Sequence, residues 1–141
     1  ECSGRKPVKS RFEPHVYEKL CEVRDGKRKR YEQITKRMLR GMSDEAIKNL
    51  ARSWGPFQIM GYKSIQLKIQ VYKLREKNAI YWGMKWIEKD YGHLLKRKRF
   101  RDAFHFHNTG QEYPSDGTSL THDPQYVASG LKYMEYFEYK K

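Results

Sequence analysis

Cysteine is scarce in this chain, which holds only Cys2 and Cys21 among its 141 residues. Two thiols supply neither a disulfide-rich scaffold nor the ligands of a structural zinc site. No export signal is visible in the amino-terminal sequence ECSGRKPVKS, because that sequence lacks an apolar segment. We therefore predict two free thiols and no essential disulfide.

Metal and cofactor signatures are missing too. His105 and His107 lie two residues apart, which is the wrong spacing for two ligands on one face of a helix. The sequence contains no Gly-rich phosphate loop, no Ser-His-Asp signature and no zinc-finger spacing. We predict neither a metal ion nor a cofactor.

Long apolar runs are absent as well, and no stretch of the sequence is long enough to span a membrane. Hydrophobic residues nevertheless make up 38% of the chain and aromatic residues 14%, with eleven tyrosines among them. That share favours a folded domain over a disordered chain. The length suits one domain with a core of its own, and we predict a single monomeric domain over residues 1–141.

Acidic residues are few beside basic ones, since 17 Asp and Glu face 30 Lys and Arg and leave a net charge of +13. Such a charge predicts a polyanionic partner, either nucleic acid or an anionic cell envelope, and does not separate the two. Two basic runs, KRKR at residues 27–30 and KRKRFR at residues 96–101, fit nucleic-acid patches. Such runs are more often solvated helix faces, which is the interpretation we favour.

Much of the chain follows the 3.6-residue period of a helix, so the predicted fold class is mainly α. We predict helices over residues 14–23, 28–41, 44–52, 64–78, 78–92 and 93–107, a loop over residues 108–122, and a last helix beginning at Asp123 and Pro124. Pro14 suits a first helical turn, Ser43 an N-cap and Gly41 a stop. Residues 64–78 also alternate like a strand, but their length favours a helix.

The predicted core positions repeat at helical spacing on one face of each segment. They are Val16, Leu20, Val23, Tyr31, Ile34, Met38, Ile47, Leu50, Ala51, Ile80, Met84, Ile87, Tyr91, Tyr126, Val127, Leu131, Met134 and Phe137.

One stretch breaks the helical pattern. Residues 53–61, SWGPFQIMG, carry no charge, and their two glycines and one proline exclude a regular helix through much of the segment. Two interpretations remain open for its Trp, Phe and Gln side chains. The segment is either a buried turn between helices or the wall of a ligand groove.

Two carboxylates and one polar cluster stand apart from the solvated ion pairs that the other charges predict. Glu1 precedes small residues, and Glu13 lies between Phe12 and Pro14, an apolar setting of the kind that raises the pKa of a carboxyl. The sequence HNTGQ at residues 107–111 offers donors and acceptors that suit sugar hydroxyl and acetamido groups. Alternatively, Asn108 only ends a helix together with the glycine two positions later.

Taken in order, these segments resemble a known family. ECSGR is similar to the E-x-S-G segment of lysozyme-like peptidoglycan-cleaving enzymes, and RFEPHVY resembles the F-E-x-H-x-F/Y stretch of phage and bacterial N-acetylmuramidases. SWGPFQIMGY resembles their S-W-G-x-F-Q-I-M-G, which is related to a lytic transglycosylase motif. HNTGQ followed by DPQYVASGL resembles the Y-N-x-G and Y-V segments of those enzymes. The resemblance covers essentially the whole chain and implies a lysozyme-like helical domain of the goose-type or lytic transglycosylase kind.

The resemblance also implies roles for particular residues. Glu1 matches the general acid, and Glu13 matches a second acidic residue. The residues that match the sugar-binding groove are Ser53, Trp54, Phe57, Gln58, Asn108 and Tyr126. In this sequence Cys2 replaces or precedes a small residue and His107 stands where transglycosylases carry Tyr. The family's acid closes a long helix, so the resemblance implies a helix upstream of Glu1, in a longer chain or supplied otherwise.

The expected activity is cleavage of the β-1,4 bond between N-acetylmuramic acid and N-acetylglucosamine, by hydrolysis or transglycosylation, with glycan strands of the anionic wall as the partner. The expected place of action is the bacterial wall, in the periplasm or outside the cell, for a phage-encoded protein or a part of a larger chain. Two alternatives remain open. One is a basic nucleic-acid-binding domain, which we disfavour, and the other is a non-catalytic glycan-binding component of a phage or secretion apparatus.

Overall fold

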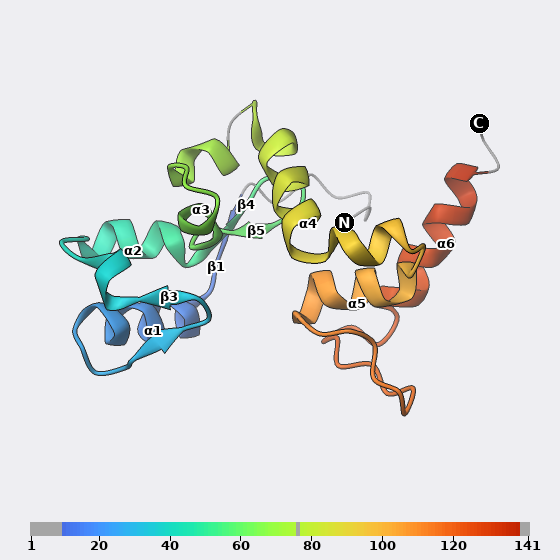
Figure 1. Ribbon diagram of the computed structural model, residues 1–141, viewed down its shortest axis with the longest axis horizontal. Helices are drawn as coiled ribbons and strands as arrows, with labels where there is room; N and C mark the ends of the chain where they lie inside the picture. The colour runs from blue at the N-terminus through green and yellow to red at the C-terminus, as the bar shows by residue number, and fades with distance from the viewer. Residues whose placement is uncertain (1–9, 76, 139–141) are drawn as a thin grey trace. The chain divides into compact units, whose positions relative to one another are not determined.

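The computed structural model describes residues 10–75 and 77–138, and it divides into two compact units, Glu1–Trp86 and Ile87–Lys141. Helices dominate the described residues of both units, and the strands in them form only two small sheets (Figure 1). The described fold is therefore mixed but largely helical, which agrees in part with the predicted mainly α class. None of the described helices is both long and apolar enough to cross a membrane.

Unit 1 combines two small antiparallel sheets with short helices. One sheet has the order β1-β4-β5, from β1 (Ser10–Phe12), β4 (Arg52–Trp54) and β5 (Ile59–Met60), and the other pairs β2 (Arg30–Tyr31) with β3 (Ile34–Thr35). The helices are α1 (Pro14–Arg24), α2 (Asp44–Leu50), α3 (Lys63–Gln66) and the 3-10 helices η1 (Lys36–Leu39) and η2 (Val71–Leu74). Register pairs Ser10 with Trp54 and Trp54 with Ile59, so the central strand joins residues far apart in the sequence.

Helices α1 and α2 form as the sequence predicts. Pro14 occupies the first turn of α1, where its missing N–H leaves no helical hydrogen bond unmade. The Ser43 hydroxyl accepts a hydrogen bond from the Ala46 amide at 3.2 Å and so caps α2. The predicted inward faces of both helices are buried in one core cluster, which contains Val16, Leu20, Val23, Ile47, Leu50 and Ala51.

The helix predicted over residues 28–41 is wrong. The chain forms the β2–β3 hairpin there, with Glu32 in the left-handed region at φ 51°. The short 3-10 helix η1 follows. Ile34 and Leu39 are fully buried against α1, whereas the predicted core residue Met38 is 42% exposed. Burial of Ile34 and Leu39 by tertiary packing outweighs the helical spacing that the sequence displays.

The helix predicted over residues 64–78 is also wrong. Helix α3 ends after four residues, because Lys68 adopts a left-handed conformation at φ 56° and the Ile69 amide turns back to the Ser64 carbonyl at 3.1 Å. The chain then forms η2, whose Leu74 is buried beside Trp54. The alternating apolar residues therefore pack in short turns rather than along one regular element.

Helix α4 (Ala79–Lys96) forms where a helix is predicted. Its first turns bury a different face from the predicted one, whereas the predicted core residue Tyr91 is buried. The predicted core residues Ile80 and Met84 are 57% and 58% exposed, whereas Trp86 is buried in the second core cluster. The helix backbone breaks at Tyr91, where φ is −139°. Trp82 and Trp86, the two indole side chains of α4, lie in or against that cluster with Trp54 and Leu74. Burial of these large rings explains why the face that carries them turns inward.

In unit 2, the helix predicted over residues 93–107 is interrupted. Lys98 adopts a left-handed conformation at φ 57° between the end of α4 and α5 (Phe100–Thr109). A long segment then leads to α6 (Tyr126–Glu138), whose Val127 is buried as predicted. Helix α6 packs closely on α5, since a Cβ at Gly130 would meet the Phe104 ring at 2.9 Å.

Candidate functional site

The uncharged stretch SWGPFQIMG is a β-hairpin rather than an irregular loop. Strands β4 and β5 pair in antiparallel register, and residues 55–58 make the turn between them. Gly55 and Gln58 both lie in the left-handed region, at φ 72° and 50°. The backbone amide of Gln58 donates to the Gly55 carbonyl at 3.1 Å. A positive φ is uncommon for a residue with an extended side chain, and such residues cluster at functional positions.

The side chain of Gln58 is held by the hairpin itself. Ser53 donates a hydrogen bond from Oγ to Gln58 Oε1 at 2.8 Å, and Gln58 Nε2 donates to the Gly55 carbonyl at 2.9 Å. Ser53 is buried and Gln58 is half-buried. The structure therefore brings these two predicted substrate-binding residues into direct contact and orients the amide.

Trp54 and Phe57 pack inward. Trp54 is only 8% exposed, and its indole Nε1 donates to the Asn49 carbonyl at 2.9 Å. Phe57 lies against Gly83 of α4, where the absence of a Cβ makes room for the ring. The two aromatic residues thus support the hairpin from its inner side.

Glycines allow the hairpin to approach its neighbours. A Cβ at Gly55 would meet the Leu74 carbonyl oxygen at 2.7 Å, and a Cβ at Gly61 would overlap the Asn49 carbonyl oxygen and the Leu50 Cα. Backbone atoms cannot yield as a flexible side-chain end can. Glycine at these positions is therefore a requirement of close packing.

Glu13 is tied to the base of the same sheet. It is the N-cap residue of α1, and its amide donates to the carbonyl of Ala51, the residue before β4, at 2.9 Å. Its carboxylate pairs with Arg11 at 3.0 Å and lies 3.8 Å from the ring of His15, with 24% of the side chain exposed. The apolar setting predicted from its sequence neighbours is therefore wrong, because the side chain lies against basic groups.

Asn108 and Tyr126, the two predicted groove residues of unit 2, stand at helix ends. Asn108 is exposed in the last turn of α5, which ends at Gly110 in the left-handed conformation at φ 75°. The Gly110 amide donates to the Phe106 carbonyl at 2.7 Å, so the predicted helix end is confirmed. Half-buried Tyr126 begins α6.

Beside these helix ends, the hydroxyl of Tyr91 lies 2.7 Å from Nδ1 of His107. Burial raises the pKa of the Tyr91 hydroxyl, and the neighbouring Tyr126 adds to the effect. Tyr91 thus lies near both Tyr126 and His107, the residue that precedes Asn108. His107 takes part in this contact from the position where the resembled transglycosylases carry Tyr.

His105 is a structural residue that the sequence did not reveal. It is fully buried, its Nε2 accepts the Leu120 amide at 3.0 Å, and its Nδ1 lies 2.7 Å from the Gln111 carbonyl. Since the Leu120 amide must donate to Nε2, the ring proton is on Nδ1 and donates to Gln111. One side chain of α5 thus holds both ends of the segment that returns toward α6. The only sequence signal was an alternating FHFH pattern.

Glu1 and Cys2 lie outside the described residues, and Cys21 is half-buried in α1. Among the residues that the structure describes, no group of three His, Cys, Asp or Glu side chains could hold a metal ion. No family model, curated protein or solved structure significantly matches the chain.

Proposed function

We propose that this chain is a peptidoglycan glycosidase that cleaves the β-1,4 bond between N-acetylmuramic acid and N-acetylglucosamine, as a muramidase or a lytic transglycosylase with a lysozyme-like fold. The resemblance of its motifs suggests this function. One structural observation carries it further. Ser53 orients the side-chain amide of Gln58 at the tip of the β4–β5 hairpin. Strand β4 of this hairpin pairs with β1, the strand that leads to Glu13.

A fixed amide is suited to a sugar. It presents a donor and an acceptor in one plane, and hydrogen bonds with neighbours orient it before the ligand arrives, which reduces the entropy lost on binding. Ser53 and Gly55 perform this orientation for Gln58.

The proposed chemistry requires an acid and a means of stabilising positive charge. Glu1 donates its proton to the glycosidic oxygen, and an oxocarbenium-like centre develops on the muramic sugar. Glu13, with its carboxylate directed by Arg11 and His15, supplies the second carboxylate in the hydrolytic version. In the transglycosylase version the substrate's own acetamido and 6-hydroxyl groups complete the reaction.

Clearing of purified peptidoglycan tests the function. The whole chain should lower the turbidity of the suspension and release soluble muropeptides. Pelleting of the protein with peptidoglycan, without release of muropeptides, would instead support a glycan-binding structural component. Binding neither to the wall nor to its fragments would leave the nucleic-acid alternative.

Mass spectrometry of the released muropeptides separates the two reactions. We favour hydrolysis, because Glu13 offers a carboxylate for an attacking water, and hydrolysis leaves a reducing muramic acid end. Products lighter by one water and without a reducing end would identify a lytic transglycosylase and remove the proposed catalytic role of Glu13.

A further inference from the structure

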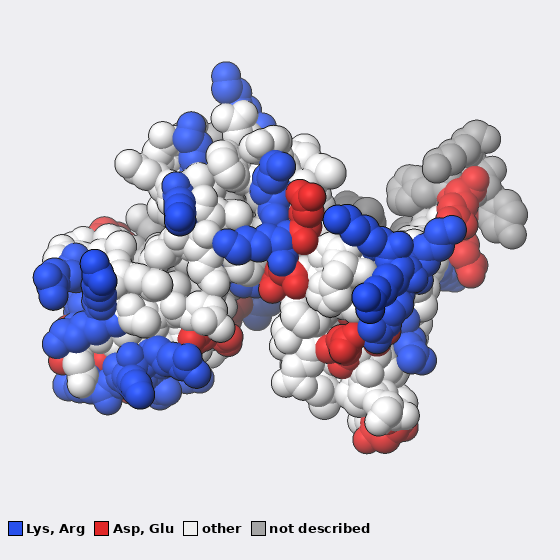
Figure 2. All heavy atoms as spheres, in the orientation of Figure 1, with Lys and Arg blue, Asp and Glu red and all other residues white. Residues whose placement is uncertain are grey.

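The part of unit 1 formed by α1, the β2–β3 hairpin and η1 carries a dense group of basic side chains. Figure 2 shows Lys and Arg gathered over this part of the molecule. An open hollow of about 290 Å³ lies within it. The hollow, called here the basic hollow, is lined by Arg24, Lys36, Arg37, Arg40 and Gly41.

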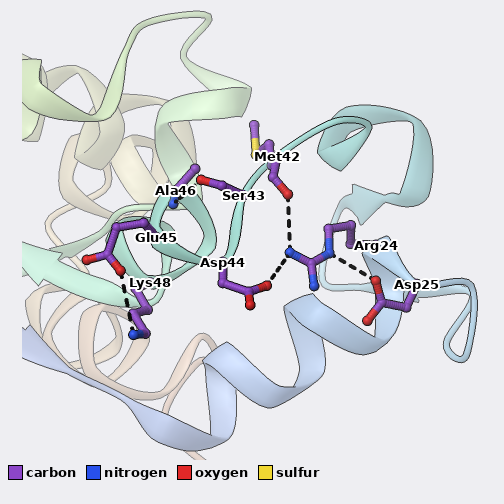
Figure 3. A network of polar contacts seen from close by, with 8 residues as sticks. All are labelled: Arg24, Asp25, Met42, Ser43, Asp44, Glu45, Ala46 and Lys48. Carbon is purple, nitrogen blue, oxygen red and sulfur yellow. Dashed lines mark hydrogen bonds and ion pairs between the residues drawn. The ribbon is translucent and has the colours of Figure 1, made fainter.

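Arg24 stabilises the segments that form the hollow. Its guanidinium donates to the Met42 carbonyl at 3.1 Å and to the carboxylates of Asp44 at 2.6 Å and Asp25 at 3.0 Å (Figure 3). These contacts fasten the segment before α2 to the end of α1, and the hydrogen bond from Arg24 lowers the pKa of Asp25. Because two carboxylates compensate its charge, Arg24 acts as an anchor rather than as the main ligand.

The other three basic side chains of the hollow are not compensated in this way. Lys36, Arg37 and Arg40 are all exposed, and within the described part of the chain none has a carboxylate within 4.0 Å. Elsewhere, Arg99 pairs with two carboxylates at 3.0 and 2.7 Å. Three cations within five residues repel one another, so the arrangement favours a bound polyanion.

The lining also restricts what the anion can be. Guanidinium and ammonium groups bind phosphate oxygens, and several of them together favour a chain of phosphates over a single anion. Among the residues that the structure describes, the hollow is lined by no aromatic side chain for stacking on a base and by no Asn or Gln for reading a base edge. The contacts therefore recognise the charge of a phosphodiester chain and no nucleobase.

We propose that the basic hollow, through Lys36, Arg37 and Arg40, binds the phosphodiester backbone of an anionic cell-wall polymer of the poly(glycerol phosphate) type. This binding holds the protein on a phosphate-bearing wall. The choice of a wall polymer rests on the proposed peptidoglycan-cleaving function, whereas the phosphate chemistry rests on the hollow alone.

A charge-matched pair of variants tests the site. Lys36→Gln/Arg37→Gln/Arg40→Gln removes three charges from the hollow, and Lys96→Gln/Arg97→Gln/Lys98→Gln removes three exposed charges from the basic run of unit 2. With poly(glycerol phosphate) as the probe, we expect the hollow variant to raise Kd at least about 10-fold near physiological salt and to flatten the salt dependence. The control should change Kd by less than about 3-fold.

Three results would overturn the proposal. The first is an equal loss of affinity in both variants, which would mean that net charge alone binds the polymer. The second is an unchanged Kd in the hollow variant. The third is displacement of the polymer by duplex DNA of equal phosphate concentration at equal or lower dose, which would assign the hollow to nucleic acid. If the triple variant fails to fold, the single variant Arg37→Gln is measured in its place, with an expected 3-fold or greater rise in Kd.

Lysis separates this proposal from the proposed function. On peptidoglycan stripped of phosphate polymers, the hollow variant should clear the suspension at the rate of the unmodified protein, whereas on intact walls it should be slower. Equal rates on intact walls would overturn the role of the hollow in retention and leave the glycosidase proposal standing. If the unmodified protein clears neither substrate, the glycosidase proposal fails, and the Kd comparison alone decides whether the hollow binds phosphate chains.

Discussion

The two units hold their connecting segments by different means. In unit 1 the turn between β4 and β5 spans residues 55–58 and is fastened by strand pairing, by glycines against backbone atoms and by the Ser53–Gln58 hydrogen bond. In unit 2 the longer segment between α5 and α6 is held by side chains on and just before α5. Buried His105 bonds Gln111 and Leu120, Asp102 accepts the Tyr113 amide, and Arg99 pairs with Glu112. The hairpin is thus restrained largely through its backbone, whereas the α5–α6 segment is restrained largely by side chains, among which His105 is fully buried.

This contrast bears on function. The hairpin orients the Gln58 side-chain amide through Ser53 and Gly55, and Gln58 is the residue we assign to substrate. The α5–α6 segment would lose two hydrogen bonds to a buried ring if His105 were removed. We therefore expect substitutions at the candidate site of unit 1 to lower activity most, and removal of His105 in unit 2 to lower the free energy of unfolding most.

The largest expected effect follows from Glu1→Gln. The amide keeps the size of the side chain but cannot donate the proton, and general acid catalysis contributes about 10²–10⁴-fold to rate. Lysis should fall by that factor while sedimentation with peptidoglycan persists. Glu18→Gln makes the same change at an exposed glutamate of α1 and should leave lysis intact. A Glu1 variant that retains more than about a third of the rate would remove Glu1 from the mechanism.

Removal of the histidine should be the largest stability effect in unit 2. His105→Ala leaves the Leu120 amide without its acceptor and opens a cavity, at an expected cost of about 3 kcal/mol in the free energy of unfolding. Chemical denaturation measures the cost, and hydrogen exchange should show faster loss of the Leu120 amide proton. His122→Ala, at an exposed position of the same segment, should cost less than about 0.5 kcal/mol. Similar values for both variants would contradict the proposed weight of His105 in holding the segment.

A pair of glycine substitutions compares the backbone requirements of the two units. Gly61→Ala places a Cβ onto the Asn49 carbonyl, so we expect about 2 kcal/mol of destabilisation from overpacking. Gly110→Ala has open space around its Cβ but must adopt φ 75°, which costs about 1 kcal/mol. Thermal unfolding of the two variants ranks them. A reversed order would show that close backbone approach does not restrain the hairpin.

Ser53→Ala should have a small effect on stability, similar to that of Gly110→Ala. Loss of the hydrogen bond to Gln58 should cost about 1 kcal/mol in folding free energy, because Gln58 keeps its bond to the Gly55 carbonyl. If the bond orients the amide for substrate, lysis should fall roughly 10-fold, mostly in kcat/KM. Ser129→Ala, at an exposed position of α6, controls for loss of a hydroxyl. Stability loss without any change in lysis would make the Ser53–Gln58 pair purely structural.

Local signals in the sequence were sufficient for α1 and α2. Pro14 at a first turn and Ser43 at an N-cap act within one helical turn of their own positions, so the sequence alone reveals their effect. The inward faces of these helices were also predicted correctly. The same reasoning failed for residues 28–41 and 64–78, where Glu32 and Lys68 adopt left-handed conformations that helical spacing does not reveal.

For the candidate site, the sequence by itself singled out the uncharged stretch and named Ser53 and Gln58, since composition and motif resemblance are properties of short segments. Only the tertiary structure decided that Ser53 bonds Gln58, that Trp54 points into the core, and that Glu13 lies against Arg11 and His15.

The physical reason is that strand pairing joins distant positions. The Ser53 hydroxyl approaches the Arg11 carbonyl at 3.5 Å across 42 positions of sequence, and the depth of Trp54 depends on Leu74 and Trp86 from two later segments. The sequence likewise determined the charge of +13, but the fold decided which cations are neutralised. Arg24 meets Asp44 only because α1 and α2 pack together, whereas Lys36, Arg37 and Arg40 meet no carboxylate within the described residues.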